Sequence, residues 1–125
     1  MPVERIDHFT IRCADLERTR AFYCDLLGLT VGPRPEIGIP GYWLYCGGIP
    51  QVHLATAKAL GGATPGGSNG AFDHVAFRIS DPEAVIAKLK ARDIPYKENT
   101  LAKFGIRQIV VHDPDGLMIE LNCHT

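Results

Sequence analysis

The sequence predicts an α+β fold built from two copies of a βαβββ unit, and three observations support this prediction. Residues 6–11 (IDHFTI) and residues 72–77 (FDHVAF) repeat one strand-like pattern about half a chain apart. Each copy is followed by helix-capping residues and by apolar residues at helical spacing. Each half then closes with two strand-like segments joined by turn-forming residues.

The first half begins with the strand at residues 6–11 and continues into a predicted helix. Asp15 suits the N-cap of this helix, and Gly28 suits its C-terminal stop. A shorter strand is predicted around residues 29–34, where the pattern is less regular. The range 41–56 then favours strand, Gly-Gly turn and strand.

The second half repeats this order. Ser80 or Asp81 caps the predicted helix, and Pro82 falls in its first turn, where its missing N–H costs nothing. A strand is predicted around residues 94–99, and the range 104–123 is typical of two strands joined by an Asp-Pro-Asp-Gly turn. The two halves therefore carry the same succession of elements.

A glycine-rich segment separates the halves. Residues 57–71 combine several glycines with a proline and little apolar periodicity, which is typical of a flexible linker. A chain of 125 residues has the size of one domain. We therefore predict a single domain, residues 1–125, with module 1 at residues 1–56 and module 2 at residues 72–125.

Composition narrows the class of protein. Hydrophobic residues make up 46% of the chain and charged residues 22%, as in ordinary globular proteins. The formal net charge of −1 gives no reason to expect nucleic acid as a partner. There is no apolar run of spanning length, no signal-like N-terminus and no C-x-x-C spacing among the 4 cysteines. We expect a cytoplasmic protein with reduced thiols and neither nucleic-acid nor membrane partners.

Strand alternation places polar residues in the middle of four strands, opposite an apolar face. His8 and His74 hold equivalent places in the two first strands, and His53 and Glu120 hold equivalent places in the two last strands. Three imidazoles and a carboxylate related by a repeat suit the first coordination shell of a divalent metal. The same alternation turns Asp7 and Asp73 to the opposite face, where we expect turn or helix contacts, or the orienting of a neighbouring group.

These features resemble the vicinal oxygen chelate superfamily, which includes glyoxalase I, bleomycin resistance protein, type I extradiol dioxygenases and methylmalonyl-CoA epimerase. The resemblance rests on residues 7–29, 73–94 and 113–121 and spans nearly the whole chain. It implies two βαβββ modules that form a curved mixed sheet around a metal, commonly in a homodimer. It does not decide whether the metal site lies within one chain or is shared across the dimer.

The resemblance also implies roles for the four polar residues. His8, His74 and Glu120 match the ligand positions of the metal-binding members. His53 stands at a fourth position, where it would be a ligand or lie behind the ligands. Fe²⁺ or Mn²⁺ is the favoured metal, with Zn²⁺ or Ni²⁺ as alternatives.

Three function hypotheses follow, and an enzyme is favoured over a binding protein. The donor set slightly favours a dioxygenase acting on a small substrate with vicinal oxygens. A glyoxalase I-like lyase or an isomerase, with Glu120 as the base, is the first alternative. A non-catalytic protein that binds a drug, an antibiotic or another small molecule is the second.

Candidate substrate-binding residues share a polar, cationic or aromatic character and lie near the predicted metal ligands or in flanking strands and loops. Thr10 and Asn122 share the strand faces of His8 and Glu120, and the arginines suit an anionic substrate. The set is Thr10, Arg34, Tyr42, Trp43, Arg107 and Asn122.

Overall fold

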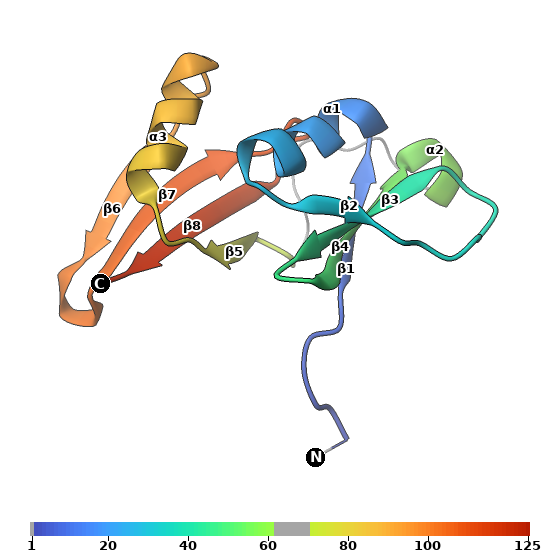
Figure 1. Cartoon of the computed structure of the whole chain (residues 1–125), viewed down its shortest axis with the longest axis horizontal. Helices are drawn as coiled ribbons and strands as arrows, with labels where there is room; N and C mark the ends of the chain where they lie inside the picture. Colours follow the sequence, from blue (N-terminus) through green and yellow to red (C-terminus); the bar gives the residue numbers. More distant parts are fainter. Residues whose placement is uncertain (1, 62–70) are drawn as a thin grey trace. The chain divides into compact units, whose positions relative to one another are not determined.

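The computed structural model describes residues 2–61 and 71–125, and these residues form two compact units (Figure 1). Each unit contains one four-stranded mixed sheet. The greater part of the segment predicted as a linker, residues 62–70, lies outside the described residues. Its first residues, Ala57–Leu60, form a short helix, α2, and the Thr56 hydroxyl caps this helix by accepting a hydrogen bond from the Ala59 N–H at 3.1 Å.

The first unit has strand order β1-β4-β3-β2, with β1 parallel to β4 and the other pairs antiparallel. Its elements other than α2 are β1 (Phe9–Cys13), α1 (Leu16–Ala21), the π-helical turn η1 (Phe22–Leu26), β2 (Thr30–Gly32), β3 (Gly41–Cys46) and β4 (Ile49–Thr56).

The second unit repeats this topology, with strand order β5-β8-β7-β6 and β5 parallel to β8. The predicted α+β class with two βαβββ units is therefore confirmed. The elements of the second unit are β5 (His74–Arg78), α3 (Pro82–Ala91), β6 (Lys97–Leu101), the 3₁₀ turn η2 (Ala102–Phe104), β7 (Ile106–His112) and β8 (Met118–His124).

Matched caps begin the two main helices. The Asp15 carboxylate accepts the Arg18 N–H at 3.0 Å, and the Asp81 carboxylate accepts the Ala84 N–H at 3.1 Å. Each bond satisfies one N–H that has no partner within the helix. Gly28 follows η1 with φ +84°, a conformation that other residues rarely adopt, and it ends the first helical segment.

The first strand of each unit begins later than the sequence suggests. Residue pairing starts at Phe9 with Val52 in the first unit and at His74 with Met118 in the second. In the first unit, Pro50 would be one of the next partners on β4, and it has no N–H to donate to a ladder. Strand alternation therefore does not fix where residues 6–8 point.

Alternation does fix the core of each unit. In β4, Val52 and Leu54 are buried, and in β8, Ile119 and Leu121 are buried. The residues between them face the other side of the sheet and remain partly exposed, apart from the small Ala55. Each sheet thus packs one apolar face and leaves the other for polar groups.

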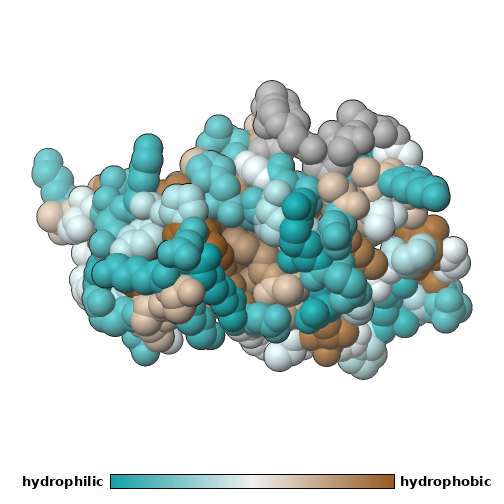
Figure 2. Space-filling view, turned by 90° about the horizontal axis from the view of Figure 1, so that it is seen from above, coloured by the Kyte–Doolittle hydropathy of each residue, from teal (hydrophilic) through white to brown (hydrophobic). Residues whose placement is uncertain are grey.

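The surface is mixed in character. Hydrophilic residues cover much of the face seen in Figure 2, and hydrophobic side chains lie between them in small patches. Scattered apolar exposure of this kind is ordinary for folded proteins. None of the helices in residues 2–61 and 71–125 has the length and apolar character needed to cross a bilayer.

Candidate functional site

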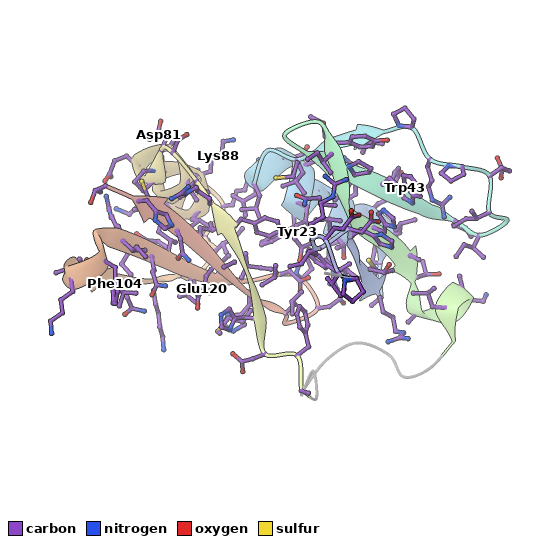
Figure 3. The ribbon with its side chains drawn as sticks, turned by 90° about the horizontal axis from the view of Figure 1, so that it is seen from below. Tyr23, Trp43, Asp81, Lys88, Phe104 and Glu120 are labelled. Carbon is purple, nitrogen blue, oxygen red and sulfur yellow. The ribbon has the colours of Figure 1, made fainter. Side chains whose placement is uncertain are left out.

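His74 and Glu120 form a close pair in the second unit. His74 Nε2 lies 3.0 Å from Glu120 Oε2. Glu120 is on β8 (Figure 3), where it pairs with Ala76, and His74 is two residues before Ala76 on the neighbouring β5. The side chains are 36% and 18% exposed, so the pair is reachable from solvent on the polar face of the sheet.

Asp73 holds the other side of the His74 ring. Its Oδ2 lies 2.8 Å from His74 Nδ1. This hydrogen bond, followed by the charge of Glu120, raises the pKa of His74 above its usual range. A carboxylate on one ring nitrogen fixes the ring orientation and directs Nε2 outward, which is the arrangement found behind metal-binding histidines.

Two amide side chains hold the other oxygen of Glu120. Gln108 Nε2 donates to Glu120 Oε1 at 3.1 Å, and Asn122 Nδ2 donates to the same oxygen at 3.4 Å. Asn122 Oδ1 is buried without a hydrogen-bond partner. Glu120 therefore presents Oε2 to His74 while Oε1 is occupied.

Gln108 was missed by the sequence reasoning. It lies on β7 directly opposite Asn122, on the face that alternates with the buried Ile109 and Val111. A polar residue in an apolar strand was the available signal. Its link to Glu120 depends on the register of β7 against β8, which the sequence pattern does not specify.

The first unit carries the repeat-related histidines in a different arrangement. The His8 and His53 rings stack with centroids 3.9 Å apart and planes inclined by 16°. The Trp43 ring stacks on the other side of His53 at 4.4 Å and 8°. Trp43 (labelled in Figure 3) lies on β3 opposite His53 on β4, and the three rings (His8, His53, Trp43) form a ring stack.

The ring stack bears on which histidine can bind a metal. A ligating nitrogen points its lone pair along the ring plane, toward an ion about 2 Å away. Two parallel rings 3.9 Å apart do not aim at one point. Burial, followed by the electrostatic effect of the neighbouring His8 ring, also lowers the pKa of His53. His53 is thus suited to be a neutral stacking partner beside His8.

His8 keeps one nitrogen available. Asp7 Oδ2 lies 2.6 Å from His8 Nδ1, as Asp73 does from His74. This hydrogen bond lowers the pKa of Asp7. Of the two roles expected for Asp7 and Asp73, the structure shows the orienting of the neighbouring histidine. Both aspartates precede a strand, so alternation does not apply to them.

Arg34 lies on the same face of the first sheet as Trp43. A Cβ built on Gly41, two residues before Trp43 on β3, would come within 2.9 Å of Arg34 Nη2. The guanidinium therefore lies against the backbone of Gly41. Its Nε is buried without a hydrogen-bond partner.

Two of the predicted substrate-binding residues face the helices instead. The Tyr42 hydroxyl donates to Glu17 of α1. Arg107 donates to Glu83 of α3 at 2.5 Å and to Glu98 of β6 at 2.7 Å, and these hydrogen bonds raise the pKa of Arg107. Both side chains are engaged within their own units, and we do not carry them into the site.

Thr10 remains exposed on β1, where it pairs with His53.

Each unit by itself presents one pair of the four predicted ligands, His8 with His53 in the first and His74 with Glu120 in the second. Across residues 2–61 and 71–125, no three His, Cys, Asp or Glu side chains are arranged to hold a metal together.

Comparison with known proteins gives a match over nearly the whole chain. The model of the Glyoxalase/Bleomycin resistance protein/Dioxygenase superfamily matches residues 5–121. The chain is 32% identical to Glyoxylase I 4 of Arabidopsis thaliana, in an alignment that covers 94% of this chain and 70% of that protein. It is 28% identical to the mitochondrial methylmalonyl-CoA epimerase of Bos taurus, over 94% of this chain and 73% of that protein.

A solved structure shares the fold. A glyoxalase family protein from Bacillus anthracis superposes with a TM-score of 0.74 at 24% identity, over 98% of this chain and 97% of that chain. At this identity the similarity shows the fold alone.

Proposed function

The chain belongs to the Glyoxalase/Bleomycin resistance protein/Dioxygenase superfamily, and from this membership we propose that it is a metal-dependent enzyme acting on a small substrate with two neighbouring oxygens. The observation that carries the proposal is the His74–Glu120 pair. Nε2 and Oε2 approach to 3.0 Å, while the other nitrogen and the other oxygen of these side chains are held by neighbouring residues.

The proposed ligands are His8, His74 and Glu120, with both units contributing to one metal. Imidazole nitrogen and carboxylate oxygen suit Fe²⁺, Mn²⁺, Zn²⁺ and Ni²⁺. We place His53 behind His8 in the ring stack, since its parallel ring does not converge with that of His8. As the family resemblance suggests, the protein would work as a homodimer.

When bound, the metal supplies a Lewis acid for the negative charge that develops on the two substrate oxygens. The side chains then move the proton. Glu120 would leave the metal to act as the general base: its Oε2 takes the proton from a carbon beside the substrate carbonyl and then, as a general acid, returns it to carbon. Gln108 and Asn122 hold Oε1, which keeps the carboxylate in position during the transfer.

This proton transfer describes a lyase or an isomerase, which we now favour over a dioxygenase. The two curated relatives named above are a glyoxylase I and an epimerase, and both align with 94% of the chain. A specific observation still supports a dioxygenase as the second candidate. If His53 stays in the ring stack, the ligands are two histidines and one carboxylate, the set found in non-haem iron oxygenases.

Metal content tests the ligand assignment. We expect protein purified without oxygen to carry a divalent metal and His74→Ala to lose it with little change in folding, since the side chain is 36% exposed. His112→Ala is the matched control, because His112 is exposed at the end of β7. Equal metal content in wild type and His74→Ala would overturn the assignment.

Activity then separates the reactions. Turnover of a hemithioacetal without oxygen uptake, in protein carrying Zn²⁺ or Ni²⁺, would support the lyase or isomerase. Oxygen uptake with catechols, in protein carrying Fe²⁺ or Mn²⁺, would replace it by the dioxygenase. Protein with no metal would favour a non-catalytic small-molecule binding protein.

A further inference from the structure

We propose that Arg34 and the ring stack of His8, His53 and Trp43 bind an oxyanion joined to a planar unsaturated group. The binding site requires no metal. Its assignment to the substrate rests on the proposed function, in which the ligand would be the part of the substrate away from the reacting carbons.

The Arg34 guanidinium is the anion-binding half of this site. It lies against Gly41, where a side chain would collide with Nη2. No carboxylate of the described residues forms an ion pair with it. A cation that contacts bare backbone and has no counter-charge is free to take an anion from solution.

The buried Nε strengthens this attraction. Arg34 Nε–H is shielded from water and meets no acceptor. The charge is therefore solvated mainly through the two Nη groups. An oxyanion placed there would gain charge-assisted hydrogen bonds in a setting of reduced polarity, where such bonds are stronger than in water.

The ring stack is the aromatic half of this site. Gly41 and Trp43 lie two residues apart on one strand face, which separates their positions by roughly 7 Å. A ligand whose oxyanion meets Arg34 can thus lay a flat group against the Trp43 ring at the end of the stack.

The chemistry of the two halves selects the ligand class. A guanidinium forms paired hydrogen bonds with planar carboxylate or with phosphate. The indole face at the end of the ring stack favours an aromatic or conjugated group over a saturated chain. Benzoate and phenyl phosphate are therefore the smallest suitable probes, and benzamide is the matched neutral molecule.

Trp43 reports directly on binding, because the chain has 1 tryptophan. Metal-free protein is titrated with each probe at fixed ionic strength while tryptophan emission is followed. We expect saturable quenching by benzoate or phenyl phosphate, and affinity reduced by about tenfold in Arg34→Gln, the loss expected for one charge-assisted interaction. The tighter of the two anions identifies the carboxylate or phosphate type.

Arg92→Gln is the control, since Arg92 is exposed at the C-terminal cap of α3 in the other unit, and it should bind as wild type does. Arg34→Lys keeps the charge but loses the planar fork, so it should bind more weakly than wild type even if Arg34→Gln fails to fold. Affinity unchanged in the foldable Arg34 variant, or benzamide binding as tightly as benzoate, would overturn the proposal.

The outcome is separable from that of the proposed function. Anion binding that depends on Arg34 in a protein that retains no metal would support the binding site and overturn the enzyme. Metal retention without anion binding would do the reverse.

Discussion

The two oxygens of the Glu120 carboxylate have different partners. One oxygen accepts from Gln108 and Asn122, and the other faces His74. The two amides contact Glu120 through N–H groups, which donate hydrogen bonds and offer no lone pair to a metal. In the proposed site they would make Glu120 bind through Oε2 alone.

Gln108→Leu tests this arrangement. Removing one donor from Oε1 loosens the carboxylate, and we expect metal affinity to fall 10- to 100-fold, the usual loss when a group behind a ligand is removed. Competition with a chromogenic chelator measures the affinity. Asn99→Leu is the control, because Asn99 faces Gln108 across the β6–β7 ladder and donates no hydrogen bond to Glu120. If Gln108→Leu kept wild-type affinity, Gln108 would have no positioning role.

At the scale of elements, each unit ties its helix to its sheet by the same device. Glu17 is the second residue of α1 and accepts a hydrogen bond from the Tyr42 hydroxyl on β3. Glu83 is the second residue of α3 and accepts a hydrogen bond from the Arg107 guanidinium on β7. The acceptor is thus a glutamate in both units, whereas the donor is a tyrosine in the first and an arginine in the second. These contacts hold each helix on the sheet face opposite the candidate ligands.

Tyr42→Phe should lower the melting temperature by an amount that depends on pH. The hydrogen bond from Tyr42, then that from Arg20, lowers the pKa of Glu17. A lowered pKa means that the bond contributes stability above the unfolded value of about 4.3 and loses it as pH falls through the folded value. The melting-temperature gap between wild type and variant should therefore be present at neutral pH and close in acid.

The same bond raises the pKa of Tyr42, so its contribution should also fade once pH rises above the ordinary tyrosine value of about 10. Tyr45→Phe is the control: its hydroxyl donates to the Pro33 carbonyl at 2.7 Å, which does not titrate in acid. If the melting-temperature difference between wild type and Tyr42→Phe stayed constant from neutral pH to pH 3, the assigned hydrogen bond would be contradicted. The effect should be small, because Glu17 is exposed.

At the scale of the whole molecule, neither unit offers more than one pair of the predicted ligands. The first presents His8 beside His53, and the second presents His74 beside Glu120. A metal that drew on both pairs would couple the stability of the two units.

Thermal unfolding with added metal tests this coupling. Free metal at about 100 times its dissociation constant should stabilise wild type by about 2.7 kcal/mol and raise its melting temperature. We expect His8→Ala and His74→Ala each to lose this rise, although they alter different units. His112→Ala should keep it. A full rise in His8→Ala would place the metal in the second unit alone and contradict the shared site.

Much of the fold was predictable because it depends on local rules. The caps at Asp15 and Asp81, the stop at Gly28 and the alternation along β8 were each predicted from a few neighbouring residues and are confirmed. The starts of β1 and β5 were placed too early, because a strand begins where a partner strand pairs with it.

By itself, the sequence determined the duplicated topology, the buried face of each sheet and the identity of four polar residues at equivalent places in the repeat. Those properties follow from periodicity and from the repeat. Only the tertiary structure decided what each side chain meets: His53 between two rings, Tyr42 and Arg107 on acidic helix residues, and Gln108 on Glu120. Periodicity fixes the face of a sheet to which a residue points, whereas its partners depend on strand register and on side chains distant in the chain.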